Sequence, residues 1–317
     1  MSLLFIREEE AQKLIDMPQA IAAVEQVFRS LGNQEAQNVP RHRVQVPGVM
    51  LHSLSASVTP LGYVGWKNYI TTRTAARFHI ALYDQEGHWV ALLEADWLGQ
   101  LRTGAASGVT TAKLANPEAK SVAVFGSGKQ ARTQLEAVCA VRPVQQASVY
   151  SHTAANRESF ALEMSDQLGI SVLAAPDPAT CLTDKEIVIT ATTSQSPLVT
   201  GDLLKPGMHI NAIGSNALNR SELSADCFSR INQIVCDDLN SCRNEAGDFV
   251  EPLKAGTITW GSMASLAELL TENKNQRECK SDITLFKSVG MAIEDIAVAA
   301  HVYEAAKEQG VGTVLDI

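Results

Sequence analysis

Apolar residues change their spacing along the first third of the chain. Residues 3–6 predict a short strand, and after Asp16 the apolar residues recur at helical spacing as far as Gly32. Asp16 and Gln19 have the pattern of a capping box, which begins a helix. From 39 to 94, short apolar runs separated by Gly, Pro and Asp predict the strands of an antiparallel or mixed sheet.

Two stretches in this part of the chain carry more particular expectations. Residues 44–54, VQVPGVMLHSL, are interpreted as one strand of the sheet. Residues 101–114 are rich in small side chains and predict a closely packed helix with Arg102 at or just before its start. A cation at that position is unfavourable for the helix dipole, so we expect Arg102 to face another group, such as a bound anion.

A strand, a glycine turn and a helix follow one another over 120–132, KSVAVFGSGKQAR. Gly126, Gly128 and Ala131 match the G-x-G-x-x-A fingerprint of dinucleotide-binding proteins. The first glycine allows the tight turn, the second lets a pyrophosphate approach the backbone, and the alanine lets helix and strand pack closely. The phosphates would lie at the positive end of the helix. The rival P-loop motif does not fit, because Ala123 occupies the position of its first glycine.

Strand-like and helix-like segments then alternate to about residue 237, which predicts a parallel sheet with helices on both faces. Ligands bind at the carboxyl ends of such strands, which here include 190–194 and 214–219. The elements expected after the first are strands at 147–150, 171–174, 186–191, 208–213 and 231–236, and a helix at 154–168.

The end of the second strand in this region bears on the choice of cofactor. An acidic residue there would bond the ribose hydroxyls of NAD and repel the 2′-phosphate of NADP. The chain has Ser151, His152 and Thr153 instead, with Arg157 one turn into the next helix. Two hydroxyls and two possible cations favour NADP. The alternative is a solvated polar turn, with NAD bound through other contacts.

A last helical pattern follows Gly290, with apolar residues on one face. Glu294 and Asp295 lie in its first turns, as the helix dipole prefers. Because this helix comes after the dinucleotide-binding pattern is complete, we expect it to pack against the N-terminal domain.

Composition narrows the classes of ligand and location. A net charge of -9 and a pI near 5.3 argue against a nucleic-acid surface and favour a small ligand. The N-terminal sequence MSLLFIREEE is neither a signal peptide nor a membrane span, and no later apolar run is long enough to cross a membrane. The 6 cysteines form no C-x-x-C pair, so free thiols in a reducing cytoplasm are expected. The 7 histidines form no H-x-x-x-H pair, and no metal is predicted.

Several stretches, in the same order along the chain, together resemble the ornithine cyclodeaminase/mu-crystallin family. The stretches are PRHRVQVP (40–47), GWKN (65–68), LRTGAASG (101–108), VFGSGKQA (124–131), TATTS (190–194), GMHINAIGSNALNRSEL (207–223) and TLFKSVGMAIEDIA (284–297). They span nearly the whole chain, and the combination of R-T-x-A-A with F-K-S-x-G-x-A-x-E-D is specific to the family.

The resemblance implies an α/β protein with two domains. Residues 119–286 are expected to form a Rossmann domain with a doubly wound parallel sheet. Residues 1–118, completed by 287–317, are expected to form a discontinuous α+β domain for substrate binding and dimerisation. The family also implies a homodimer, a nicotinamide cofactor (NADP or NAD) and a small α-imino or α-amino acid as substrate.

Carried onto this sequence, the family's carboxylate clamp falls on Arg43, Lys67 and Arg102. Arg43 is preferred to Arg41 because its spacing to Pro47 fits better. Two guanidinium groups and an ammonium can hold a carboxylate through charge-assisted bonds. Neighbouring cations would lower the pKa of Lys67, so assistance in protonation is a further hypothesis. The cofactor-binding residues expected are Thr103, Gly126, Gly128, Lys129, Gln130, Ala131, Ser151, His152, Thr153, Arg157, Thr192, Asn216, Val289 and Gly290.

Asn216 is the informative departure from the family. Cyclodeaminating members have an aspartate there as a proton acceptor, and asparagine cannot act as a general base. It can still orient an imine nitrogen or the nicotinamide amide by hydrogen bonds, so Lys67 and Asn216 are the catalytic candidates. We therefore expect an oxidoreductase that reduces a cyclic ketimine of the Δ1-pyrroline-2-carboxylate type. The alternatives are an ornithine cyclodeaminase that recycles NAD and a non-catalytic carrier similar to mu-crystallin.

Overall fold

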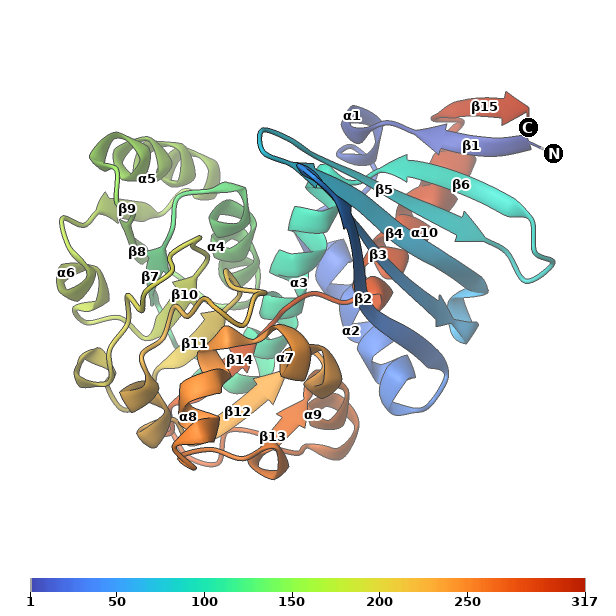
Figure 1. The fold of residues 1–317 in the computed structure, drawn as a ribbon. Helices are drawn as coiled ribbons and strands as arrows, with labels where there is room; N and C mark the ends of the chain where they lie inside the picture. The colour runs from blue at the N-terminus through green and yellow to red at the C-terminus, as the bar shows by residue number, and fades with distance from the viewer. Residues whose placement is uncertain (1, 317) are drawn as a thin grey trace. The chain divides into compact units, whose positions relative to one another are not determined.

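The computed structural model describes residues 2–316, and the chain divides into two compact units (Figure 1). The first unit contains the residues up to Ala106 and those from Gly290 onward. The second unit is the continuous segment Ser107–Val289. Each unit is built on its own β-sheet.

The sheet of the first unit is mixed, with seven strands in the order β15-β1-β6-β5-β4-β3-β2. Strands β2 to β6 pair antiparallel with their neighbours, and β1 is parallel to β6. The strands are β1 (Ser2–Ile6), β2 (Ala36–Val46), β3 (Val49–Val58), β4 (Tyr63–Thr72), β5 (Ala76–Tyr83), β6 (Trp89–Glu94) and β15 (Thr313–Asp316).

One face of this sheet is covered by helices. Helix α10 (Ala292–Gln309) packs against α2 (Met17–Gly32) and against the central strands (Figure 1). Leu54 and Ile80 are buried on this face, whereas Val64 and Ile70, which point the other way, are 46% and 43% exposed. Alternation along the strands therefore leaves one face in the core and the other open. The predicted packing of the last helix on the N-terminal sheet is confirmed, and a short helix α1 (Glu8–Ala11) precedes α2.

Two expectations for this part of the chain are wrong. Residues 44–54 are not one strand, because β2 and β3 form a hairpin whose turn contains Gly48 at φ 81°, a conformation that favours glycine. Helix α3 (Asp96–Leu114) begins more than a turn before the predicted start, because the Glu8 carboxylate accepts hydrogen bonds from the first backbone N–H groups of the helix. Arg102 therefore lies in the second turn, and the helix-dipole argument does not apply to it.

The sheet of the second unit is parallel throughout, with eight strands in the order β13-β12-β14-β11-β10-β7-β8-β9. This order, with β7 next to both β8 and β10, is that of the doubly wound Rossmann fold and confirms the predicted fold class. Strands β13 and β14 were not predicted. The strands are β7 (Ser121–Phe125), β8 (Gln146–Tyr150), β9 (Ser171–Ala174), β10 (Ile187–Thr190), β11 (His209–Ala212), β12 (Gln233–Cys236), β13 (Met263–Ser265) and β14 (Thr284–Lys287).

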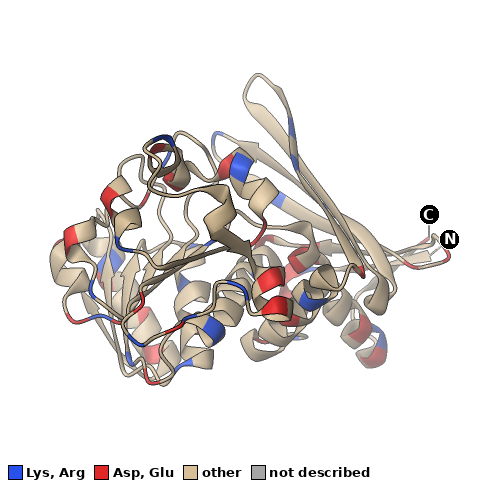
Figure 2. Cartoon of the chain, turned by 90° about the horizontal axis from the view of Figure 1, so that it is seen from below, with Lys and Arg blue, Asp and Glu red and all other residues tan. Residues whose placement is uncertain are grey.

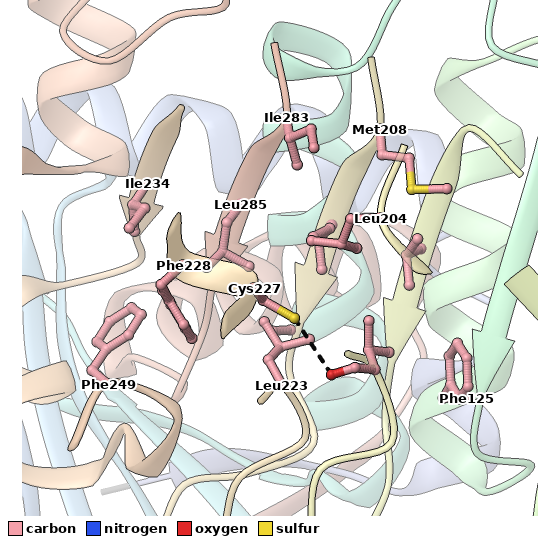
Figure 3. Packing of buried hydrophobic residues seen from close by; sticks show 14 of the residues in the cluster. Phe125, Leu204, Met208, Leu223, Cys227, Phe228, Ile234, Phe249, Ile283 and Leu285 are labelled. Atoms are coloured by element: carbon pink, nitrogen blue, oxygen red, sulfur yellow. Dashed lines mark hydrogen bonds between the residues drawn. The ribbon is translucent and has the colours of Figure 1, made fainter. Parts of the chain in front are cut away.

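Apolar side chains of the strands and helices of this unit form two hydrophobic clusters. One contains Phe125, Phe228 and Phe249 (Figure 3), and the other contains Leu135 and Phe160. Strands buried on both faces explain the nearly continuous apolar runs in this part of the sequence. The helices of the unit are α4 (Lys129–Val141), α5 (Ala154–Leu168), α6 (Pro178–Leu182), α7 (Leu239–Glu245), α8 (Val250–Lys254) and α9 (Leu266–Glu272).

Charged residues of both signs are interspersed on the helices of the ribbon in Figure 2, and several form ion pairs such as Arg132 with Glu163. All six cysteines are free thiols, as predicted, and Cys227 donates a weak hydrogen bond to Val199 inside the core (Figure 3). None of the helices between residues 2 and 316 combines the length and apolar character needed to cross a membrane.

Candidate active site

The glycine turn after β7 has the geometry of a dinucleotide-binding turn. Gly126 adopts φ 107°, and a Cβ there would lie 2.4 Å from the carbonyl oxygen of Ala191, so no side chain fits. A Cβ at Gly128 would meet nothing within 4 Å, which leaves the backbone open to a ligand. Gly128 is the N-cap of α4 without a side-chain cap, so the first N–H groups of the helix face outward. Ala131 is fully buried where helix and strand pack together.

A cavity of about 480 Å³ opens beside this turn, within the size range of small-molecule sites. Six of the predicted cofactor-binding residues line it: Gly126, Gly128, Ser151, His152, Thr153 and Thr192. The open glycine backbone, the uncapped helix terminus and the hydroxyl-rich wall fit the phosphates and riboses of a dinucleotide.

Three other predicted residues lie near this cavity without lining it. Arg157 donates a hydrogen bond from Nη1 to the carbonyl oxygen of Ser151, 3.0 Å away, and so supports the loop after β8. Lys129 is exposed in the first turn of α4. Gln130 follows it, and its side-chain oxygen is buried without a hydrogen-bond partner among residues 2–316.

The loop after β11 carries Asn216, whose side chain is exposed. The loop itself is fixed by its neighbour Ser215, whose hydroxyl donates to the carbonyl oxygens of Ala217 and Arg220. The carbonyl oxygen of Ser215 accepts a hydrogen bond of 2.8 Å from the buried ammonium of Lys287. The backbone next to Asn216 is thus held in place, while the side chain of Asn216, with its amide group, is exposed.

The first unit contains a buried cluster of charges on three elements. Lys67 on β4 donates a hydrogen bond of 2.7 Å from Nζ to Oδ1 of Asp295 on α10. Arg102 on α3 donates from Nε to the same oxygen at 3.0 Å and from Nη1 to Oε2 of Glu294 at 2.5 Å. Both carboxylates are fully buried, and Oδ2 of Asp295 has no hydrogen-bond partner among the described residues. Two of the three predicted clamp cations are therefore adjacent.

Arg41 and Arg43, both on β2, lie in different surroundings. A Cβ at Gly290 would lie 3.0 Å from Nη1 of Arg102 and 3.4 Å from Nη2 of Arg41, so the two guanidinium groups converge on this glycine. Arg43 is more exposed and donates from Nε to Nδ1 of His52 at 3.3 Å. His52 in turn stacks on Tyr69, with ring centroids 4.1 Å apart.

The pKa values follow from these contacts. Burial lowers the pKa of Lys67 to about 8, because the charges of Arg102 and Arg41 add to the desolvation and outweigh the attraction of Asp295. Burial also opposes the charge of Arg102, but the two carboxylates beside it raise its pKa. Burial, followed by the charges of Arg43 and Arg41, lowers the pKa of His52 to about 4, so this imidazole is neutral at pH 7.

The remaining predicted residues have structural contacts of their own. Val289 donates its backbone N–H to Oδ2 of Asp237, 2.7 Å away, and Gly290 follows it at φ 87°. Thr103 donates its hydroxyl to the carbonyl oxygen of Gly99 within α3. No group of three or more His, Cys, Asp and Glu side chains is arranged for a metal within residues 2–316.

Sequence reasoning missed the acidic half of the buried cluster. Glu294 and Asp295 were assigned only to the helix dipole, although they neutralise Lys67 and Arg102. A signal was available, because α10 is apolar on nearly every side and charged residues within such a helix must be paired. His52 and Glu222 were also missed, although Glu222 lies within the stretch 207–223 that resembles the family.

The fold and the glycine turn after β7 define a Rossmann-type dinucleotide-binding protein with a second, mixed-sheet unit. The chain belongs to the ornithine cyclodeaminase/mu-crystallin family, whose model matches residues 3–310, and this confirms the resemblance seen in the sequence.

Two solved structures and a further relative are similar over nearly the whole chain. A Δ1-pyrroline-2-carboxylate reductase of Thermococcus litoralis, in complex with NADH and L-proline, matches with a TM-score of 0.94 at 35% identity, covering 98% of this chain and 99% of that one. An archaeal alanine dehydrogenase dimer with bound NAD matches with a TM-score of 0.92 at 30% identity over 100% of both chains. A Δ1-pyrroline-2-carboxylate reductase of Bacillus cereus is 30% identical over 321 residues, 98% of each sequence.

Proposed function

We propose that this protein is an NAD(P)H-dependent oxidoreductase that reduces a small cyclic ketimine or α-imino acid, of the Δ1-pyrroline-2-carboxylate type, to the L-amino acid, or catalyses the reverse reaction. The two reductases described above, both similar to this chain over nearly its whole length, support this substrate class. The structural observation that carries the proposal is the buried charge cluster of the first unit.

That cluster brings three cations close together. Arg41 and Arg102 converge on Gly290, and Arg102 and Lys67 both donate to Oδ1 of Asp295. A substrate carboxylate bound beside them would accept charge-assisted hydrogen bonds from these cations. The geometry supports Arg41 rather than Arg43 as the third cation, because Arg41 converges with Arg102.

The two arginines would hold the carboxylate and fix the orientation of the imine. Lys67, with a pKa of about 8, is mostly protonated at pH 7 and can still release a proton from Nζ to an imine nitrogen. Asn216 would orient polar groups of the ligand through its amide, since it cannot accept a proton as aspartate would. The nicotinamide, when bound, supplies the hydride.

We further propose NADP as the preferred cofactor. The cavity wall after β8 carries Ser151, His152 and Thr153 and no acidic residue, so nothing there repels a 2′-phosphate. The solved relatives described above hold NADH and NAD. Preference for NADP would therefore distinguish this chain from them, and a comparison of both reduced cofactors in one assay tests it.

We also propose a homodimer that forms through the open face of the first unit's sheet. Val44, Val64 and Ile70 are 64%, 46% and 43% exposed, which is costly for apolar side chains in water. The archaeal relative is described as a dimer. Light scattering on the purified chain should give twice the mass of one chain, and a strictly monomeric species would refute the proposal.

The deciding experiment adds Δ1-pyrroline-2-carboxylate to the purified protein with NADPH and, separately, with NADH. We expect the near-ultraviolet absorbance of the reduced nicotinamide to fall as L-proline forms. Ornithine with NAD serves as the comparison reaction, because a cyclodeaminase would release ammonia and proline from it without net reduction. Ammonia release without ketimine reduction would replace the proposal by the cyclodeaminase, and cofactor binding without either reaction would replace it by a carrier.

A further inference from the structure

Glu222 has a fully buried carboxylate that connects two segments of the second unit. Its Oε1 accepts hydrogen bonds from the backbone N–H and the hydroxyl of Thr192, both at 2.7 Å. Its Oε2 accepts from the hydroxyl of Thr190 at 2.9 Å and from the backbone N–H of Gly214 at 2.8 Å. Four groups contact the four acceptor positions of the carboxylate, an arrangement that suits the deprotonated form.

The segments joined by Glu222 are the loops at the carboxyl ends of β10 and β11. Thr192 lines the dinucleotide cavity, and its neighbour Ala191 packs directly on the glycine turn at Gly126. A Cβ at Gly214 would lie 2.3 Å from the backbone nitrogen of Thr192 and 2.4 Å from Oε1 of Glu222. The two loops are therefore in direct contact, with Glu222 behind the wall of the cavity and not among its lining residues.

The backbone of Glu222 fixes a second part of the same wall. Its carbonyl oxygen accepts hydrogen bonds from the N–H groups of Leu198 at 2.9 Å and Val199 at 3.2 Å, and Leu198 lines the cavity. Its own N–H donates to Oδ1 of Asp248 at 2.7 Å. One residue thus holds the wall of the cavity both at Thr192 and at Leu198.

We infer that Glu222 is a positioning residue for the dinucleotide, which holds residues 191–198 in the conformation that binds the cofactor without touching it. The inference rests on the proposed function for the nature of the ligand. It adds a residue that controls the affinity for the cofactor and leaves the affinity for the imino acid to the cluster around Lys67.

The test compares Glu222→Gln with the unchanged protein by direct titration of NADPH and NADH, followed by protein fluorescence. Glutamine has the same shape but turns an NH₂ group toward N–H and O–H donors, so at least one buried hydrogen bond is lost and a donor is left unsatisfied. We expect the Kd of both cofactors to rise about tenfold or more, which corresponds to the loss of one hydrogen bond to a charged group. The KM of the imino acid at saturating cofactor should stay within about twofold, since its clamp is untouched.

Glu186→Gln is the matched control. Glu186 also accepts hydrogen bonds from two backbone N–H groups and a hydroxyl, those of Lys120 and Ser121, but at the opposite end of β10. It should leave both cofactor Kd values unchanged. Thr190→Val removes only one of the four donors to Glu222 and guards against misfolding of the glutamine variant. It should weaken cofactor binding by a few-fold, and a cooperative thermal transition would show that the variant is folded.

Equal cofactor affinity in Glu222→Gln, Thr190→Val and the unchanged protein would overturn the inference. An equal loss in Glu186→Gln would overturn it too, because the effect would then be a general loosening of the sheet. A failure of the proposed function gives a different result, since the unchanged protein would then bind neither NADPH nor NADH or would bind them without reducing the ketimine.

Discussion

Two buried lysines, one in each unit, both pair with an aspartate, but their pKa values shift in opposite directions. Lys67 on β4 is 3% exposed and lies 2.7 Å from Asp295, and Lys287 on β14 is 0% exposed and lies 2.8 Å from Asp248. Yet the pKa of Lys67 is lowered to about 8, whereas that of Lys287 is raised. Burial lowers both pKa values, so the difference comes from the second layer of neighbours.

Around Lys67 that second layer is positive, since Arg102 and Arg41 both lower its pKa. Around Lys287 it is negative, since Glu222 adds to the effect of Asp248. In the first cluster the guanidinium groups of Arg102 and Arg41 lie near Lys67, an arrangement that suits an anionic ligand. In the second, Lys287 instead donates to the carbonyl oxygen of Ser215 and so helps to fix a loop. The ion pair alone therefore says little about function, and the net charge of its surroundings says much more.

Replacing each lysine by methionine is the most direct test of the different roles of Lys67 and Lys287. Lys67→Met removes a cation of the clamp and the proposed proton donor, so we expect turnover to fall by about 10²–10⁴-fold. Arg102 still pairs with Asp295, which limits the loss of stability. Steady-state kinetics with saturating imino acid and cofactor measure the effect. The exposed Lys254→Met on α8 is the control and should behave as the unchanged protein.

Lys287→Met should reduce the stability of the fold more than the turnover. It leaves the buried carboxylates of Asp248 and Glu222 without their cation, so we expect a loss of about 3–5 kcal/mol in the free energy of unfolding. Protein that remains folded should keep its KM for the imino acid. Denaturant titration gives the first quantity and kinetics the second. If Lys67→Met lost mainly stability and Lys287→Met mainly turnover, the assignment of the two clusters would be reversed.

The next largest effect separates the two arginines of β2. Arg41→Ala should raise the KM of the imino acid by about 10–100-fold, because a charge-assisted hydrogen bond to the carboxylate is lost. Arg43→Ala should raise it by less than about threefold, because this guanidinium contacts His52 and is more exposed. Initial rates over a range of imino-acid concentrations distinguish the two. A larger effect of Arg43→Ala would restore the clamp expected from the spacing to Pro47.

The features of the fold that could be predicted from the sequence were those set by residues close together along the chain. The glycine turn at 126–131, the order of strands from β7 to β12 and the capping box of α2 all follow from local patterns, and the structure has each of them. Strand β14 was missed because its four residues, Thr-Leu-Phe-Lys, are all buried yet include only two apolar ones, so they form neither an apolar run nor an alternating pattern. The start of α3 was missed because its cap, Glu8, lies 88 positions away from Asp96.

In the candidate site, too, features set by local sequence were predicted and long-range pairings were not. Lys67 and Arg102 were found because the residues around them match family stretches, but the partner of Lys67 lies 228 positions along the chain. Pairings at such separation are set by which strands and helices pack together, and one sequence does not contain that information. Arg43 was preferred to Arg41 on its spacing to Pro47, but Arg41 lies between Val39 and His42, where the pairing of β2 with β3 shifts register, so the direction of its side chain does not follow from alternation along the strand.

The smallest expected effect is on the pH dependence of kcat/KM, through the influence of Asp295 on the pKa of Lys67. A lysine with a pKa of about 8 holds its proton below that pH and loses it as the pH rises through it. We therefore expect kcat/KM for the imino acid to fall on the alkaline side with a midpoint near pH 8, since the free enzyme must carry the ammonium to bind the carboxylate.

Asp295 is the neighbour that raises the pKa of Lys67, so Asp295→Asn should lower it and move the alkaline limb of the profile to lower pH by about one unit. The matched control is Glu304→Gln, an exposed carboxylate on the same helix that should leave the limb in place. Rates must be measured on protein shown to be folded at each pH, because Asp295 also accepts a hydrogen bond from Arg102. A limb that stayed at the same pH in Asp295→Asn would mean that another group titrates there, and the contrast between the two lysines would then lose its link to catalysis.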